Sequence, residues 1–253
     1  MTAAMTPSDA AISQVLIAKG IKAYFTSRGE VSASPYSGFN ICHYTGDSQE
    51  SVDRCRARLE HCAGLMPGAI IVPRQTHSVN CRVIDSFPVE ESDIENVDAL
   101  VTTLHGVAVG VSTADCVPVL LADTVNGVIA AAHAGWRGAV GGIVDVTLSR
   151  MVALGAEPRY IKAVMGPCIC RDCFEVGEEV AGQFPDECVV REEGCKPHVD
   201  LPAYVASRLI AGGVSPMCIA MPSACTKCDS DRYFSARALG INSGRNFSMI
   251  VMD

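Results

Sequence analysis

One stretch constrains the fold of this chain more than any other, the segment 107–138, VAVGVSTADCVPVLLADTVNGVIAAAHAGWRG. Its apolar, β-branched runs over Val107–Val111 and Val117–Leu121 predict two strands. The pair Asn126-Gly127 predicts a tight hairpin turn into a third strand, which ends at His133. A helix is expected to begin shortly afterwards. The segment therefore predicts one supersecondary unit of strand, bend, strand, turn, strand and helix start.

Metal-ligating side chains lie where these strands end. Cys116 follows the first run, His133 ends the third, and His77 follows a separate apolar run over 69–72. Rigid elements can aim such side chains at one point. Two histidines and a thiolate form a three-ligand zinc set with a fourth position open. The long intervals between these residues match no compact zinc signature, so two structural histidines and one buried thiol are the alternative.

Composition and charge exclude several classes of function. The 253 residues are 49% hydrophobic and carry a net charge of −8, which suits a globule with a sizeable core. No run of Lys or Arg offers a basic face, so we expect no nucleic-acid partner. The amino terminus lacks a basic region and carries Asp9 before its short apolar run, so it does not resemble a signal peptide. No apolar run reaches about 18 residues, so we expect a cytoplasmic protein with no membrane partner.

Strands and helices interleave along the chain, with short turns between several expected strands. We therefore predict an α/β fold of the α+β type, with mixed β-sheets flanked by helices. Residues 1–18 are expected to be a loose leader before a single catalytic domain over 19–253, and the acidic segment 88–98 an exposed loop. The other expected strands are 21–26, 69–73, 79–85, 161–165, 217–221 and 247–252, and the expected helices are 47–62, 139–154, 178–184 and 202–211.

Polar residues beside the three candidate ligands suggest further roles. Asp115 cannot lie unpaired in a core, because burying a lone carboxylate is costly. It is expected to orient a ligand histidine or to carry a proton, and a salt bridge to Arg137 is the alternative. Arg137 follows Trp136 where a helix is expected to start, which favours an anion site. Simple packing of Trp136, with Arg137 paired to a carboxylate, is the other interpretation.

The chain contains 13 cysteines, an odd and high number. Without a secretory signal, reduced thiols are favoured over disulfides. Five of them have metal-like spacing, namely Cys168, Cys170, Cys173, Cys225 and Cys228. A structural zinc or a redox pair is one interpretation of this group, and reduced thiols in or near the core is the one we favour.

Six motifs in order resemble those of the YfiH family, over about Tyr24 to Ile250. They are SGFN around Asn40, the triplet Gln75-Thr-His77, TADCVPVLL, AAHAGWRG, a GP…FEVG segment, and a CT…FSAR…GR segment. Members of that family have been described as multicopper polyphenol oxidases (laccases) and as purine nucleoside phosphorylases with adenosine deaminase activity. Two departures stand out: Ser78 occupies a position where the family often has glycine, and segment 168–173 is unusually rich in cysteine.

This resemblance implies that His77, Cys116 and His133 are zinc ligands, the trio already proposed from the residues alone. It implies an α/β fold with mixed sheets. It also implies a purine nucleoside enzyme that cleaves adenosine, inosine and methylthioadenosine with phosphate to free base and ribose 1-phosphate, and deaminates adenosine. Its partners are then a small-molecule nucleoside and phosphate. With Asp115 added, the three ligands make up the predicted catalytic set.

The substrate must be held by other side chains in the same motifs. The predicted nucleoside- and phosphate-binding residues are Asn40, Gln75, Arg137, Ser235, Arg237 and Arg245. An arginine fork matches an oxyanion, although arginines that simply pair with surface acids are the alternative. The amide of Asn40 is expected either to bond a base or sugar edge or to support a turn.

Three other functions remain open. Copper-dependent phenol oxidation by a laccase normally needs many histidine ligands, and this chain has six histidines in all. A Cys–His hydrolase would use Cys116 as nucleophile and His133 or His77 as base. A non-catalytic metal or nucleotide sensor is the third. The sequence predicts Zn²⁺ with Cu²⁺ as the alternative, and leaves the choice between monomer and homodimer open.

Overall fold

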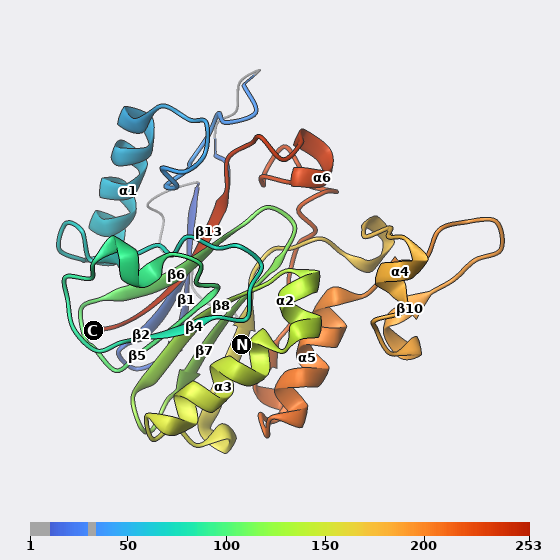
Figure 1. Cartoon of the computed structure of the whole chain (residues 1–253). Coiled ribbons are helices and arrows are strands. Elements are labelled where there is room, and N and C mark those ends of the chain that lie inside the picture. The colour runs from blue at the N-terminus through green and yellow to red at the C-terminus, as the bar shows by residue number, and fades with distance from the viewer. Residues whose placement is uncertain (1–10, 30–33) are drawn as a thin grey trace.

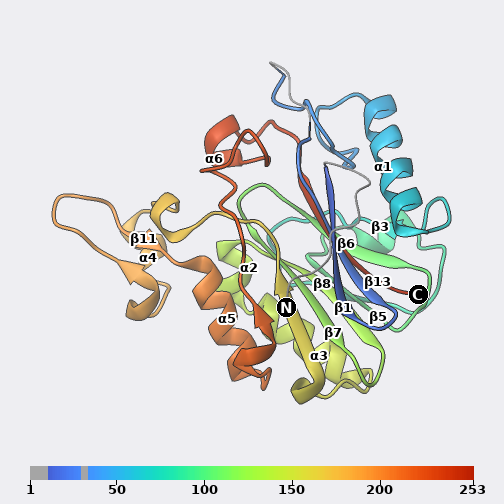
Figure 2. The same ribbon diagram turned by 180° about the vertical axis from the view of Figure 1, so that it is seen from behind.

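The computed structural model describes residues 11–29 and 34–253. Two large β-sheets lie at its centre, with α1 on one side and α3 and α5 on the other (Figures 1 and 2). The first sheet contains, in spatial order, β1 (Ile12–Ala18), β2 (Ile21–Thr26), β13 (Asn246–Met252), β6 (Ala108–Thr113) and β3 (Ile70–Ile71). The second contains β12 (Ile219–Ala220), β9 (Ile161–Met165), β7 (Val117–Asp123), β8 (Val128–Ala134), β5 (Ala99–Thr102) and β4 (Cys81–Ile84).

Both sheets are mixed, which confirms the predicted α/β fold with mixed sheets and flanking helices. The parallel pairs are β3–β6, β4–β5 and β9–β12, and the other pairs in these two sheets are antiparallel. A small antiparallel pair, β10 (Val189–Val190) and β11 (His198–Val199), projects with α4 to one side (Figure 2).

The helices are α1 (Gln49–Ala63), α2 (Trp136–Gly141), α3 (Ile143–Ala153), α4 (Glu178–Ala181), α5 (Leu201–Ala211) and α6 (Ala236–Leu239). Short 3-10 turns are η1 (Glu91–Ile94), η2 (Pro158–Tyr160), η3 (Arg171–Cys173), η4 (Asp186–Cys188) and η5 (Pro216–Cys218). Within residues 11–29 and 34–253, none of the helices combines the length and apolar character that crossing a bilayer requires.

Apolar side chains on both faces of the strands build the core. In β8, Ile129 and Ala131 pack between the two sheets, whereas Ala130 and Ala132 face the layer of α2, α3 and α5. In β13, Ile250 points between the sheets and neighbouring side chains pack towards α1. Each buried Ile or Leu side chain stabilises the fold by about 1.5–3 kcal/mol. Because both faces are covered, these strands occur in the sequence as continuous apolar runs.

The β7–β8 hairpin confirms the predicted turn and positions the site. Gly127 takes the left-handed conformation with φ +67°, and the Asp123 carboxylate accepts the backbone N–H groups of Val125 and Asn126 at 2.8 Å each. The register pairs Val117 with Ala134, the last residue of β8. Cys116, directly before β7, is therefore held beside the end of β8 that carries His133.

Several predicted boundaries are wrong. The strand predicted over 217–221 is the turn η5 followed by the two-residue β12, and the helix predicted over 178–184 ends at Ala181. Residues 12–18 form β1, paired with β2, where a loose leader was predicted, and residues 1–10 of that leader lie outside the described residues. The helix predicted over 139–154 begins earlier and is divided in two, because Gly142, at φ +96°, interrupts the helical backbone. Ser48, not Asp47, caps α1 by accepting the Ser51 N–H at 3.2 Å.

Candidate metal centre

Three side chains from distant parts of the chain converge at one end of the β7–β8 hairpin. His77 lies in the loop between β3 and β4, Cys116 precedes β7, and His133 is near the end of β8. One ligand atom of each lies within 4.8 Å of the others. Cys116 Sγ is 3.8 Å from His77 Nε2, and the two imidazole rings meet edge to face. His77 is exposed and His133 is only 3% exposed, so the group is open to solvent on one side.

A carboxylate that the sequence analysis overlooked fixes both histidines. Asp98 is fully buried and accepts the His133 Nδ1–H at 2.7 Å. It also accepts the backbone N–H groups of Thr76, His77 and Ser78 at 3.1, 3.0 and 2.8 Å, and the Ser78 hydroxyl at 2.7 Å. The contact orients the His133 ring so that Nε2 remains free to bind a metal, as in many metal sites where a carboxylate supports a ligand histidine.

Two expectations about these acids need correction. Residues 88–96 are exposed or half-buried, as predicted for segment 88–98, but Asp98 at its end is the most deeply placed acid of the site. Of the two roles expected for Asp115, orienting a ligand histidine belongs to Asp98 instead, and carrying a proton stays a prediction. The signal available in the sequence was the position of Asp98 directly before the apolar run Ala99–Thr102, which forms the buried strand β5.

The charges in this cluster stabilise one another. Burial acts to raise the pKa of the Cys116 thiol, but the charge of His133 and hydrogen bonds from His133 and His77 outweigh it and lower the pKa to about 6. For His133, burial acts to lower the pKa, yet Cys116 and Asp98 raise it to about 9. Burial of Asp98 is likewise outweighed by hydrogen bonds from His133 and Ser78, which lower its pKa to about 2. The arrangement therefore favours a thiolate, the form that ligates metal.

The backbone around the centre has unusual features. His77 and Asp115 have φ values of +62° and +92°, in the left-handed region that side chains other than glycine rarely adopt. Such strain is typical of functional sites. Gly135, after His133, has no Cβ, and a Cβ there would lie 2.6 Å from His77 Cδ2 and 3.0 Å from Cys116 Sγ. A glycine at 135 therefore lets both ligands approach.

Asp115 contacts the C-terminal part of the chain rather than Arg137. Its carboxylate accepts the Thr226 hydroxyl at 2.7 Å and the Arg237 backbone N–H at 2.7 Å. Its own carbonyl accepts the Ile169 N–H at 2.9 Å. Asp115 thus joins the loop before β7 to two later segments, and the alternative salt bridge to Arg137 is absent from the described residues.

Four of the predicted substrate-binding residues have their polar groups engaged within the protein. Asn40 is fully buried, and its amide bonds Thr45 and Asp47, which is the turn-supporting alternative. Gln75 bonds the backbone of Ser112 in both directions at 2.8 Å. Ser235 caps α6, and the Arg245 guanidinium donates to carbonyls of its own loop. None of these four belongs to the His77–Cys116–His133 group.

The two other predicted arginines are exposed. Arg237 stacks over Phe174 at 5.7 Å and donates to the Glu175 carbonyl at 2.9 Å. Arg137 stacks over Trp136 at 4.4 Å, and its guanidinium makes no hydrogen bond or ion pair to the described residues. Arg137 lies two residues after Gly135, which is beside His77 and Cys116, and the Arg237 backbone N–H bonds Asp115.

The donor set fits a transition metal with an open position. Imidazole nitrogen and thiolate sulfur are ligands of both zinc and copper, and three protein ligands leave room for water or substrate. Two hollows of about 740 and 490 Å³ lie elsewhere on the described surface, the first beside Tyr44 and Arg74 and the second beside Cys170. Neither is lined by the three candidate ligands, of which His77 is the exposed one.

Comparison with known proteins places this geometry in a family. Residues 22–253 match the family described as multi-copper polyphenol oxidoreductase laccase. The chain belongs to this family. It is 43% identical to "Adenosine deaminase RL5" from an unknown prokaryotic organism, over 92% of this chain and 94% of that protein. It is 38% identical to a purine nucleoside phosphorylase of Bacteroides thetaiotaomicron, over 90% and 89% of the two chains.

Solved structures agree with the predicted resemblance to YfiH proteins. YlmD from Geobacillus stearothermophilus superposes with a TM-score of 0.86 at 25% identity, over 98% of both chains. YfiH from Bacillus licheniformis superposes with a TM-score of 0.84 at 25% identity, over 93% of this chain and 94% of that one. The family and the fold predicted from the sequence are therefore confirmed, and this family member is an enzyme.

Proposed function

We propose that this enzyme is a zinc-dependent purine nucleoside phosphorylase with adenosine deaminase activity. It cleaves adenosine, inosine and methylthioadenosine with phosphate to the free base and ribose 1-phosphate, and it converts adenosine to inosine. The observation that carries the proposal is the convergence of His77, Cys116 and His133 on an accessible face. The names of the relatives that match nearly the whole chain support the choice of substrate.

In this proposal His77, Cys116 and His133 hold the zinc ion. When bound, zinc with an open position supplies a Lewis acid that polarises oxygen ligands and makes a water molecule acidic near pH 7. Cys116 contributes a thiolate, which its neighbours favour. Asp98 keeps the His133 ring oriented and fixes the backbone of the His77 loop. The protein thus holds two ligands through one buried carboxylate.

Deamination also needs a group that moves a proton, and Asp115 is our candidate. Asp98 is unsuited, because five hydrogen-bond donors already occupy its carboxylate oxygens. Asp115 accepts two hydrogen bonds, is only half-buried, and directly precedes Cys116. A carboxylate can accept about four hydrogen bonds, so Asp115 retains capacity for substrate.

Phosphorolysis needs an anion-binding side chain, and we assign that role to Arg137. Its guanidinium has no hydrogen-bonding partner among the described residues and lies over the Trp136 ring, with Cζ 4.4 Å from the ring centroid. A planar guanidinium presents paired donors that match phosphate oxygens. We also propose that the protein acts in the cytoplasm on small molecules, with neither nucleic acid nor membrane as partner.

Product analysis with defined metal content tests this function. The protein is stripped with a chelator, reloaded with Zn²⁺ or Cu²⁺, and incubated with adenosine with and without phosphate. We expect inosine without phosphate, adenine and ribose 1-phosphate with phosphate, and none of these three products from the stripped protein. Absence of all three products from the zinc-loaded protein would refute the proposal.

A copper-dependent phenol oxidase is the second candidate, because the family description names that activity and a His₂Cys set also occurs in blue-copper sites. The copper-loaded protein would then show an intense visible band and oxidise phenols. A Cys–His hydrolase predicts a different result: iodoacetamide would rapidly alkylate Cys116 in the metal-loaded protein and abolish activity. In our proposal the ligating thiolate is protected by zinc.

A further inference from the structure

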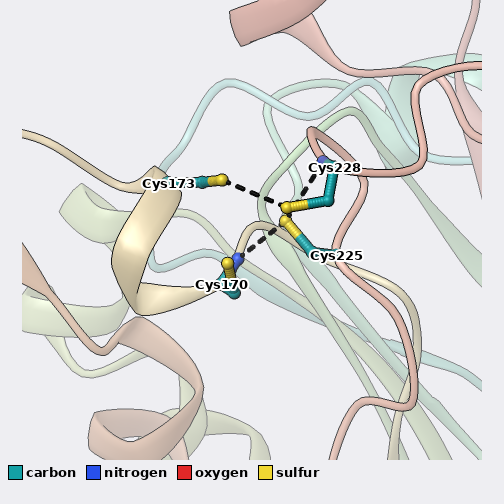
Figure 3. Close-up of side chains that lie close together, drawn as sticks. All are labelled: Cys170, Cys173, Cys225 and Cys228. Carbon is teal, nitrogen blue, oxygen red and sulfur yellow. Dashed lines mark hydrogen bonds between the residues drawn. The ribbon is translucent and has the colours of Figure 1, made fainter.

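A second group of metal-ligating side chains lies outside the centre already described. Cys170 directly precedes η3 and Cys173 is its last residue, whereas Cys225 and Cys228 belong to the loop between β12 and α6. Figure 3 shows the side chains of the four converging from these two turns. One sulfur of each lies within 4.8 Å of the others, and Cys173 Sγ is 3.4 Å from Cys228 Sγ. We propose that these four cysteines bind a zinc ion as a closed, structural tetrathiolate site.

The sulfur geometry is close to that of a zinc site. A tetrahedron with zinc–sulfur bonds of about 2.3 Å has sulfur–sulfur edges of about 3.8 Å. The four sulfurs approach this spacing with all of the cysteines in the free form. Each pair also has the two-residue spacer that is typical of structural zinc ligands. Lys227 places a positive charge in one spacer, whereas Arg171 in the other spacer is paired with Asp172 at 2.9 Å.

The backbone supports the cluster as it supports thiolate ligands in metal sites. The N–H groups of Cys170 and Cys228 point at Cys225 Sγ, at 3.3 and 3.5 Å (Figure 3). Such donors stabilise a metal-bound thiolate and fix its direction. Cys168, the fifth cysteine of the sequence pattern, is buried in the core and is not part of the cluster. The prediction of thiols in or near the core thus fits Cys168, and it also fits Cys173 and Cys225, which are half-buried and pack against the same core.

The position of the cluster suggests what the ion does. Cys168 and Cys225 form a β-bridge, and Thr226 N–H donates to the Cys168 carbonyl at 3.0 Å. The Thr226 hydroxyl in turn bonds Asp115, the residue before Cys116. An ion held by two cysteines from each segment would therefore fasten the loop after β9 to the loop before α6, and steady the backbone behind the first centre. Its role is structural, since four thiolates fill a tetrahedral coordination shell.

Metal stoichiometry tests this site without relying on activity. Wild-type protein grown with zinc should contain about two zinc ions per chain by mass spectrometry, and titration with a mercurial reagent should release both. A Cys170→Ser/Cys225→Ser variant should keep about one. The matched control is Cys195→Ser, which alters an exposed cysteine outside the cluster and should keep about two.

Two further variants separate this site from the first centre and from misfolding. A His77→Ala/Cys116→Ala variant, which lacks the first centre, should retain about one zinc, and its cobalt form should show the visible spectrum of a tetrathiolate. Cys228→His, which supplies another zinc ligand at the exposed corner, should retain the second ion, whereas Cys228→Ala should hold it less tightly. The proposal would be overturned if the wild-type protein and the Cys170→Ser/Cys225→Ser variant contained the same amount of zinc. Iron bound at the four cysteines would overturn it too. If the protein proved inactive on nucleosides, the proposed function would fail, but the zinc contents expected for this second site would stay the same.

Discussion

The two groups of metal-ligating side chains in this chain differ in composition, exposure and support. His77, Cys116 and His133 come from three distant segments, mix nitrogen with sulfur, and depend on the buried carboxylate of Asp98. The four cysteines come from two short turns and are supported by their own backbone N–H groups. A three-ligand set leaves a position for substrate, whereas four thiolates close the shell. In our proposals the first group therefore carries the chemistry, and the second holds two segments of the chain together.

The largest difference is expected when each group loses a ligand. Cys116→Ala should lower nucleoside turnover by at least about a thousandfold, because catalytic groups that act as a unit fail together. The metal content should fall by about one ion per chain, with the tetrathiolate ion retained. Product chromatography and metal analysis of the same preparation check both outcomes. A variant that retains most of its activity would show that the open centre is not where the chemistry occurs.

Removing the carboxylate that orients the ligands should have the next largest effect. Asp98→Asn keeps the size of the side chain but not its charge, and should reduce zinc affinity or activity by about 10- to 100-fold. Competition with a chelating dye measures the affinity. Asp123→Asn is the matched control, since Asp123 is equally buried and also accepts backbone N–H groups, but in the β7–β8 turn. It should lower stability and leave zinc affinity unchanged; an equal loss in both variants would make the Asp98 effect a general folding defect.

Filling the space beside His77 and Cys116 should lower the zinc affinity of the open centre less than loss of the Asp98 carboxylate does. Gly135→Ala would place a methyl group 2.6 Å from His77 Cδ2, so that ring must move. We expect zinc affinity at the open centre to fall by about tenfold, with no change at the cysteine cluster. Gly182→Ala, at a remote helix end where the nearest atom is 3.2 Å away, serves as the control in the dye competition. Unchanged affinity in Gly135→Ala would mean that His77 is not a ligand.

Loss of the proposed phosphate-binding side chain, Arg137, should affect only the reaction that uses phosphate. Arg137→Ala should raise the KM for phosphate severalfold while deamination, which uses no phosphate, is preserved. Arg159→Ala is the control, because Arg159 likewise stacks on its neighbouring aromatic residue, Tyr160, far along the chain. Steady-state kinetics with varied phosphate distinguish the two. Equal losses of phosphorolysis and deamination in Arg137→Ala would assign Arg137 a packing role.

Substitution of the clustered cysteines is expected to have the smallest effect on catalysis. Cys170→Ser/Cys225→Ser should lower Tm by about 2–4 °C for each kcal/mol of stability lost, while kcat at low temperature changes little. Differential scanning calorimetry and the nucleoside assay measure the two quantities. A large loss of kcat with an unchanged Tm would reverse the distinction between the two groups.

The sequence revealed those features that depend on local pattern. Strands buried on both faces occur as apolar runs, so β6, β7 and β9 were found, and Cys116 and His133 stood out because they lie where such strands end. Asp98 was missed because its role depends on the loop 76–78, which folds back over it from a separate segment. The helix break at Gly142 was visible as a glycine pair but was outweighed by the apolar periodicity of the segment.

Other features could not be derived because they depend on distant contacts. Asn40 and Arg245 lie in recognisable motifs, yet Asn40 Oδ1 accepts the Arg245 backbone N–H at 3.4 Å, so these motifs partly serve to join two segments. The metal-like spacing of the cysteines was evident, but spacing alone cannot show that Cys173 and Cys228 meet. That meeting depends on the β-bridge between residues 168 and 225.

The place of β13 has a consequence for synthesis of the chain. Residues 246–252 lie between β2 and β6 and pair with both. Until residues 246–252 have been synthesised, those two strands lack their common neighbour and each has an unpaired edge. The first sheet therefore closes only once β13 has been made, and such unpaired edges favour aggregation until then.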